Sequence, residues 1–209
     1  MAIKRFFADS DSTITNAMKA GLSPTNRGDK SNMGKSDILE VFSIWGQITG
    51  SIDQPDESQE LSRVLVKFPV SEIVTARNNK QIPASGSVKF NLSLYNAEHS
   101  NTVPENFNLV VLAVAQEWEE GIGLDMEDYS DEGTVNWVNR KNNVAWSKVG
   151  GHYHSEPIFS ASFDTGFEDL SVDITKLVEE WIAGTKQNYG VGVKLIQEQE
   201  AYFSSSLGG

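Results

Sequence analysis

The sequence has no cysteine among its 209 residues and only three histidines. The missing cysteines exclude disulfides, thiolate metal sites and thiol catalysis together. His99, His152 and His154 are accompanied by no Gly-x-Ser-x-Gly motif, so no hydrolase triad is indicated and we expect no enzymatic activity. Basic residues are also scarce, with 17 against 29 acidic ones. The resulting net charge of -12 argues against a nucleic-acid partner.

Long apolar runs are missing as well. No stretch approaches the ~18 apolar residues of a membrane-spanning helix, and the opening residues lack the apolar core of about 7–15 residues found in a signal peptide. There is no Gly-x-x-x-x-Gly-Lys phosphate loop and no complete dinucleotide motif. We therefore expect synthesis in the cytoplasm, no membrane partner and no cofactor.

The chain does contain many short segments of β type, separated by Gly, Asn, Asp, Ser and Pro. The clearest is 87–95, where Val88, Phe90, Leu92 and Leu94 alternate with polar residues. Such alternation indicates an antiparallel sheet with one solvated face. Further strands are expected at 3–7, 12–15, 38–45, 62–70, 107–116, 134–138, 144–146, 158–163, 169–174, 190–196 and 201–206.

One segment has a helical pattern, with Leu177, Val178 and Trp181 on one face and Gly184 at its end. Asp173 or Thr175 can cap its start. The sequence thus predicts an all-β fold: residues 1–209 as one antiparallel, jelly-roll-like β-sandwich with a single short helix near 175–183. The expected core residues are Phe68, Phe90, Leu92, Leu94, Leu112, Val114, Trp118, Val172, Leu177 and Trp181.

Acidic residues concentrate between Glu117 and Glu132. Calcium takes six to eight oxygen ligands, and Asp125, Asp128 and Asp131 are the candidates, although their order does not follow the calcium-loop template. The alternative is a solvated acidic loop without a metal, which we expect. Glu119 with Asp125 could also imitate a glycosidase pair, but coincidence explains such a pair in so acidic a chain.

Aromatic residues allow two interpretations, a packed core or a platform that stacks against a sugar ring. Trp118, Trp137 and Trp181 have apolar neighbours at strand or helix spacing, which favours the core. Trp146 and Tyr153 are the least core-like, so they are the candidate ligand residues for a glycan. His152 and His154 lie two residues apart and could share a metal or simply occupy a loop.

Several short motifs follow one another along nearly the whole chain. They are Asp11-Ser-Thr-Ile14, Asn32-Met-Gly34, Ser62-Arg-Val-Leu-Val-Lys-Phe68, the strand 87–95, Leu112-Ala-Val114 leading into Trp118-x-Glu120, Thr134-Val-Asn-Trp137, Leu170-Ser-Val-Asp-Ile-Thr175, Val178-x-x-Trp181 with Gly184, and Asn188-Tyr-Gly190-Val-Gly-Val. In this order they resemble the DNRLRE-type modules. The resemblance implies a jelly-roll β-sandwich similar to carbohydrate-binding modules, usually without catalytic residues.

The opening Met-Ala-Ile-Lys-Arg-Phe-Phe-Ala-Asp-Ser-Asp and Ser36-Asp-Ile-Leu-Glu-Val-Phe42 resemble structural proteins of tailed marine phages. That likeness implies a virion protein of the head, neck or tail, made in the host cytoplasm. Its partners would be other virion proteins, in a homo-oligomer or symmetric assembly. The alternative is a carbohydrate-binding module that attaches a virion or an enzyme to a surface glycan.

The first and last expected strands, 3–7 and 201–206, carry aromatics close to the termini. If they form sheet edges, Phe6, Phe7, Tyr202 and Phe203 would supply the assembly contacts, because unpaired edges accept neighbouring strands. The alternative is that both strands pair internally and their aromatics fill the core.

Overall fold

The computed structural model describes residues 3–19, 27–45, 59–98, 103–124 and 128–200. Within these ranges the protein is built mostly of antiparallel strands with a few short helices, which confirms the predicted all-β class. The strands are β1 Ser10–Thr15, β2 Ser43–Trp45, β3 Gln59–Lys67, β4 Asn91–Leu94, β5 Phe107–Val114, β6 Asn139–Lys141, β7 Val144–Ala145, β8 Tyr153–Phe163, β9 Leu170–Asp173 and β10 Val191–Leu195. The helices are α1 Val70–Asn78, α2 Thr175–Ile182 and α3 Gln197–Glu200.

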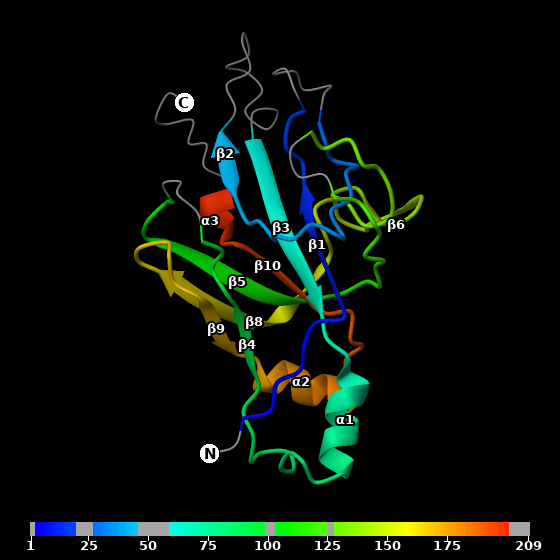
Figure 1. The fold of residues 1–209 in the computed structure, drawn as a ribbon, viewed down its shortest axis with the longest axis vertical. Coiled ribbons are helices and arrows are strands. Elements are labelled where there is room, and N and C mark those ends of the chain that lie inside the picture. Colours follow the sequence, from blue (N-terminus) through cyan, green and yellow to red (C-terminus); the bar gives the residue numbers. More distant parts are fainter. Residues whose placement is uncertain (1–2, 20–26, 46–58, 99–102, 125–127, 201–209) are drawn as a thin grey trace.

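The main sheet has the strand order β1-β3-β10-β5-β8, and β2 extends one end of β3 (Figure 1). Every pairing within it is antiparallel. Strand β3 lies inside this sheet and alternates Val64 and Val66 on one face with Leu65 on the other. Because both faces of β3 are buried, the main sheet separates two hydrophobic cores.

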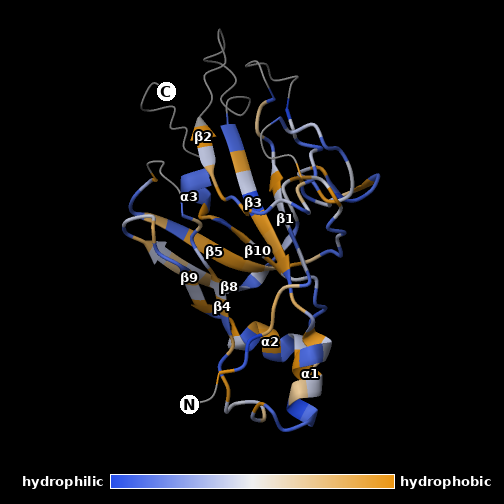
Figure 2. Cartoon of the chain, in the orientation of Figure 1, coloured by the Kyte–Doolittle hydropathy of each residue, from blue (hydrophilic) through white to orange (hydrophobic). Residues whose placement is uncertain are grey.

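The larger core lies between the main sheet and a second layer made of the β4–β9 pair with α1 and α2. Its main-sheet side includes Val111 and Val193, and its second-layer side includes Leu92 and Leu177. Figure 2 shows the apolar residues concentrated along the central strands β3, β5 and β10. Burial of this apolar surface is the dominant stabilising contribution.

A smaller core covers the opposite face, next to β1 and β3. Ile14 and Leu65 from the sheet meet Trp118, Trp137 and Trp146, which come from the irregular segments after β5. The indole N–H groups of Trp118 and Trp146 donate to the carbonyls of Tyr189 and Asn136 at 2.7 and 3.0 Å. These bonds satisfy the polar edge of each buried ring, so both indoles can pack against the sheet without an unpaired N–H.

The helix predicted near 175–183 is confirmed as α2. Leu177, Val178 and Trp181 face the larger core, Asp173 accepts the Thr175 N–H at 3.0 Å, and Gly184 ends the helix with a φ of +69°. The prediction of a single helix is wrong. Helix α1 follows Pro69 and buries Ile73 and Ala76 one turn apart, and α3 follows β10.

Three expected strands are also corrected. Residues 3–7 and 134–138 are not strands, and only the last three residues of 38–45 form one, as β2. Segment 201–206 lies outside the described residues. Six expected core residues are buried: Leu92, Val114, Trp118, Val172, Leu177 and Trp181. Phe68, Phe90 and Leu94 pack at the border of the larger core, whereas Leu112 points to the other, half-exposed side of β5.

Candidate functional site

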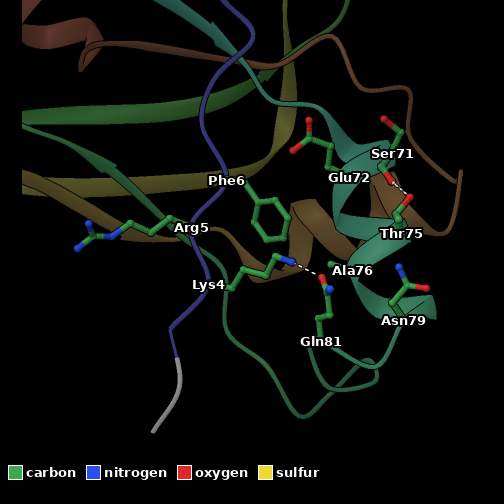
Figure 3. Close-up of a pocket in the computed structure, with 9 residues that line it drawn as sticks. All are labelled: Lys4, Arg5, Phe6, Ser71, Glu72, Thr75, Ala76, Asn79 and Gln81. Carbon is green, nitrogen blue, oxygen red and sulfur yellow. Dashed lines mark hydrogen bonds between the residues drawn. The ribbon is translucent and has the colours of Figure 1, made fainter.

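The N-terminal segment 3–9 leads into β1 and passes beside helix α1, with which it lines a pocket (Figure 1). Phe6 packs against the larger core, and the Lys4 ammonium donates to the Gln81 side chain (Figure 3). The Asp9 N–H donates to the Lys67 carbonyl at 3.0 Å, where the segment joins the sheet. An extended segment is therefore anchored at three points without belonging to a sheet.

A shallow pocket of about 360 Å³ lies between this segment and α1. Its lining is Lys4, Arg5, Phe6, Ser71, Glu72, Thr75, Ala76, Asn79 and Gln81 (Figure 3). The Phe6 ring lies on the side of the helix, whereas Arg5 extends away from it. The pocket holds polar side chains around one aromatic ring, which is typical of a contact surface rather than of an enclosed ligand cavity.

The outward side of the N-terminal segment carries two of the most exposed apolar side chains in the described structure. Ile3 is 84% exposed and Phe7 is 77% exposed. The candidate Phe7 therefore faces solvent, and the candidate Phe6 serves mainly as an anchor. Lys4 and Arg5 add positive charge to this surface in a chain whose net charge is -12. We call the surface formed by Ile3, Arg5 and Phe7 the N-terminal face.

A second exposed apolar group lies where β4 ends and β9 begins. Tyr95 is 74% exposed and Phe167 is 60% exposed. Asn96 ties their segments together, since its backbone N–H donates to Asp169 Oδ1 at 2.9 Å and its side chain donates to the Gly166 carbonyl at 3.0 Å. Phe167 also borders a pocket of about 330 Å³ with Asn96, Ala97 and Glu98.

The loop before Phe167 is fixed by Glu168. This carboxylate accepts the backbone N–H groups of Asp164 and Thr165 at 3.0 and 2.8 Å. The hydrogen bond from the Thr165 backbone is the main reason that the pKa of Glu168 falls to about 2. The loop therefore keeps this carboxylate ionised and its backbone ordered across the physiological pH range.

The two residues proposed for a glycan platform, Trp146 and Tyr153, lie instead against the smaller core. Trp146 is 5% exposed, and the Tyr153 ring packs over Gly192, where even a methyl group would collide with it. Burial raises the pKa of Tyr153 to about 12, and its hydroxyl donates to the Gly150 carbonyl at 3.1 Å. Trp146 is therefore buried, and Tyr153 is half-buried with its hydroxyl directed into the protein.

Next to Tyr153 lies an ion cluster that the sequence did not reveal. Arg63 donates through Nε and Nη2 to the two carboxylate oxygens of Glu200, at 2.7 and 2.9 Å. Lys194 donates to the same carboxylate at 2.7 Å, and the Arg63 guanidinium lies 4.8 Å from the centre of the Trp137 ring. Two cations thus share one carboxylate at the end of α3. Arg63 and Glu200 are 137 residues apart, so no local pattern could have indicated the pair.

The acidic segment after β5 is tied to neighbouring protein groups. Glu119 pairs with Lys141 at 3.3 Å, and Asp131 accepts the Leu124 N–H at 2.9 Å. Asp128 is exposed and Asp125 lies outside the described residues. No group of three His, Asp or Glu residues in the described ranges has the arrangement of a metal site.

A buried asparagine, rather than an ion, organises this segment. Asn32 donates to the carbonyls of Glu120 and Val135 at 2.6 and 2.8 Å, and its side-chain oxygen accepts the Gly123 N–H at 2.8 Å. Gly121 lies against it with a φ of +85°, and a Cβ there would approach the Asn32 oxygen to 2.3 Å. The sequence offered no signal for this role beyond the Asn-x-Gly motif.

The two histidines flank Tyr153 at the start of β8. The carbonyl of His152 accepts the Ala115 N–H at 2.8 Å, next to the irregular start of β8. Burial is the main cause that lowers the pKa of His154, with Lys186 adding to the effect. His99 lies outside the described residues.

Comparison with known proteins adds no relative. No family model matches the chain, and no curated protein matches it either. Of the described helices, none combines the length and the apolar character needed to cross a bilayer. The functional argument therefore depends on the surfaces and contacts described above.

Proposed function

We propose that this chain is a non-enzymatic structural protein of a tailed phage particle, attached through its N-terminal face to neighbouring virion proteins. The observation that carries the proposal is the exposure of Ile3 and Phe7 on a segment that Phe6 and Lys4 anchor to the body. Large apolar side chains held outward by a rigid support are typical of protein contacts. The likeness of the opening residues to phage structural proteins supports the same conclusion.

The finer architecture that we propose is a jelly-roll sandwich. The main sheet would form one layer, and β4 with β9 would form part of the second. Residues from both layers meet in the larger core, for example Val111 and Leu92, which supports this arrangement. Such a body presents loops and edges in fixed positions, so that symmetry can multiply weak contacts into firm attachment.

The test replaces the two outward side chains in the encoding phage, Ile3→Ser together with Phe7→Ser. We expect the purified variant to keep its melting temperature, because both side chains face solvent, but to be lost from assembled particles. Val149→Ser is the matched control, since Val149 is 60% exposed on another surface. Normal incorporation of the double variant would contradict attachment through the N-terminal face.

A second candidate function is glycan binding, and the pair Tyr95 and Phe167 favours it. Both rings are exposed at one end of the β4–β9 pair, and the carboxylates of Glu98 and Asp169 lie in the same segments. Exposed rings next to polar groups suit the stacking and hydrogen bonding of a sugar. This candidate replaces Trp146 and Tyr153 with different residues.

A glycan array probed with the purified chain tests this second function. Tyr95→Leu and Phe167→Leu keep an apolar side chain but remove the ring, so each should abolish retention of any glycan that the unmodified chain binds. Val149→Leu serves as the control. An array without a retained glycan, or retention that both variants preserve, would reject the glycan function.

A further inference from the structure

Strand β8 forms one edge of the main sheet, and the two edges of that sheet differ. At the opposite edge, β1 is covered by the segment before β2, through a bridge between Thr13 and Met33 and a bond from the Glu40 N–H to the Thr13 hydroxyl. Strand β8 is the last strand in the order and pairs only with β5 among the described strands (Figure 1).

The register shows which backbone groups of β8 point outward. The Val114 N–H donates to the Gly190 carbonyl and the Ile196 N–H donates to the Asn108 carbonyl, so even-numbered residues of β5 direct their backbone groups toward β10. The odd-numbered residues of β5 then face β8 and bond to Phe159, Ala161 and Phe163. The alternating residues Ile158, Ser160 and Ser162 direct their N–H and C=O groups away from the sheet.

No described segment pairs with those outward groups. The nearest cover is Lys186, which donates to the Glu156 carbonyl before the regular part of the edge begins. Ile158 is 54% exposed, and the neighbouring Phe159 is half-buried at the border of the larger core. A row of unpaired backbone groups with apolar side chains beside it is a template for another strand.

The composition of this edge favours pairing over protection. Soluble proteins usually protect an exposed edge with lysine, proline or an inward charge. Within β8, Glu156 and Pro157 precede the stretch from Ile158 to Phe163, which reads Ile-Phe-Ser-Ala-Ser-Phe and itself contains none of these. It is also an uncharged stretch in a chain of net charge -12, so no like charges face each other within the paired residues themselves.

We propose that β8 pairs antiparallel with β8 of a second copy of this chain, around a two-fold axis at Ser160. In this register Ile158 lies opposite Ser162 of the second copy, and Phe159 lies opposite Ala161 of the second copy. Each large side chain thus meets a small one on both faces of the joined sheet. The outward groups of Ile158, Ser160 and Ser162 all find partners.

A second copy fits this edge better than an unrelated strand, because the stretch is complementary to itself and the two-fold contact is closed. Closed pairing joins the β8 edges of the two copies to each other, so this contact cannot propagate into a fibre. The register also brings Glu156 near Asp164 of the second copy. Salt should therefore strengthen the dimer by screening this repulsion, whereas it would weaken a contact based on ion pairs.

The test is sedimentation equilibrium of the purified full chain. Ser160→Pro removes the outward N–H without affecting the bonds to β5, and Ser160→Ala keeps that N–H as the matched control. We expect a dimer for the unmodified chain and for Ser160→Ala, and a dissociation constant at least about tenfold higher for Ser160→Pro. A monomer for the unmodified chain at every concentration, or equal dimerisation of both variants, would overturn the proposal.

Hydrogen exchange of the unmodified chain gives a second readout that does not depend on the folding of any variant. The amides of Ile158, Ser160 and Ser162 should exchange more slowly as protein concentration rises, while those of the outward residues of β2 should not change. Exchange that is independent of concentration at these three amides would also overturn the proposal. The outcome is separate from the proposed virion function, since a chain absent from particles could still dimerise in solution.

Discussion

Removing the carboxylate of Glu200 should destabilise the protein more than removing the Lys194 ammonium that it binds. The side chains of Arg63, Lys194 and Glu200 are 14%, 15% and 8% exposed, so all three charges are largely withdrawn from water. Glu200→Ala leaves two positive charges side by side without a counter-ion. Breaking a buried ion pair in this way costs about 3–5 kcal/mol of unfolding free energy, and the residual exposure favours the lower value.

Lys194→Met removes one of the two cations and leaves the other paired with the carboxylate. Arg63 still binds Glu200 with two hydrogen bonds, and the methionine side chain fills the space of the lysine stem, so we expect a loss of only about 1 kcal/mol. Urea unfolding followed by tryptophan fluorescence measures both free energies, and Glu198→Ala is the control because Glu198 is exposed on the same helix. Equal losses for Glu200→Ala and Lys194→Met would refute the reasoning that one carboxylate neutralises two cations.

Two further predictions concern the core and the pH dependence. Trp181→Ala should lower the unfolding free energy by about 3–5 kcal/mol, because Trp181 is 6% exposed in the larger core, and a loss below about 1 kcal/mol in urea unfolding would place it outside. Burial, reinforced by Glu120, raises the pKa of Asp11, so its charged form opposes folding at neutral pH. Because the carboxyl pKa of Asp11 is higher in the folded than in the unfolded state, the unfolded state loses this proton at a lower pH. The unfolding free energy therefore falls as the pH rises from the unfolded pKa through the folded pKa. Asp11→Asn should therefore raise the melting temperature at pH 7 and have little effect below the ordinary pKa of 3.8, and an equal gain at both pH values would contradict this assignment.

The sequence predicted the elements whose side chains follow a clear period. Strand β4 and helix α2 were found because Leu92 and Leu94 alternate and because Leu177, Val178 and Trp181 share one helical face. Helix α1 was missed because Ile73, Val74 and Thr75 are β-branched, a composition that favours strands, and only packing of Ile73 and Ala76 against the core makes the segment helical.

The contacts that define the surfaces could not be predicted, because they join distant or irregular segments. Trp146 follows β7 in an irregular segment, so its burial against the main sheet was not expected, whereas the apolar neighbours of Trp137 did favour its place in the core. The N-terminal segment looks like a strand in sequence, but it lies beside α1 outside any sheet, and this placement separates the anchoring Phe6 from the exposed Phe7. The acidic segment was expected to be a solvated loop, and its sequence did not reveal that Asn32 fixes its backbone through three hydrogen bonds.

The most direct test of the virion proposal is quantitative mass spectrometry of intact, purified particles of the phage that encodes this chain. The proposal predicts that peptides of the chain are present in a fixed ratio to the major capsid protein and remain after washing in high salt. Peptides found only in the infected-cell lysate and missing from purified particles would contradict it.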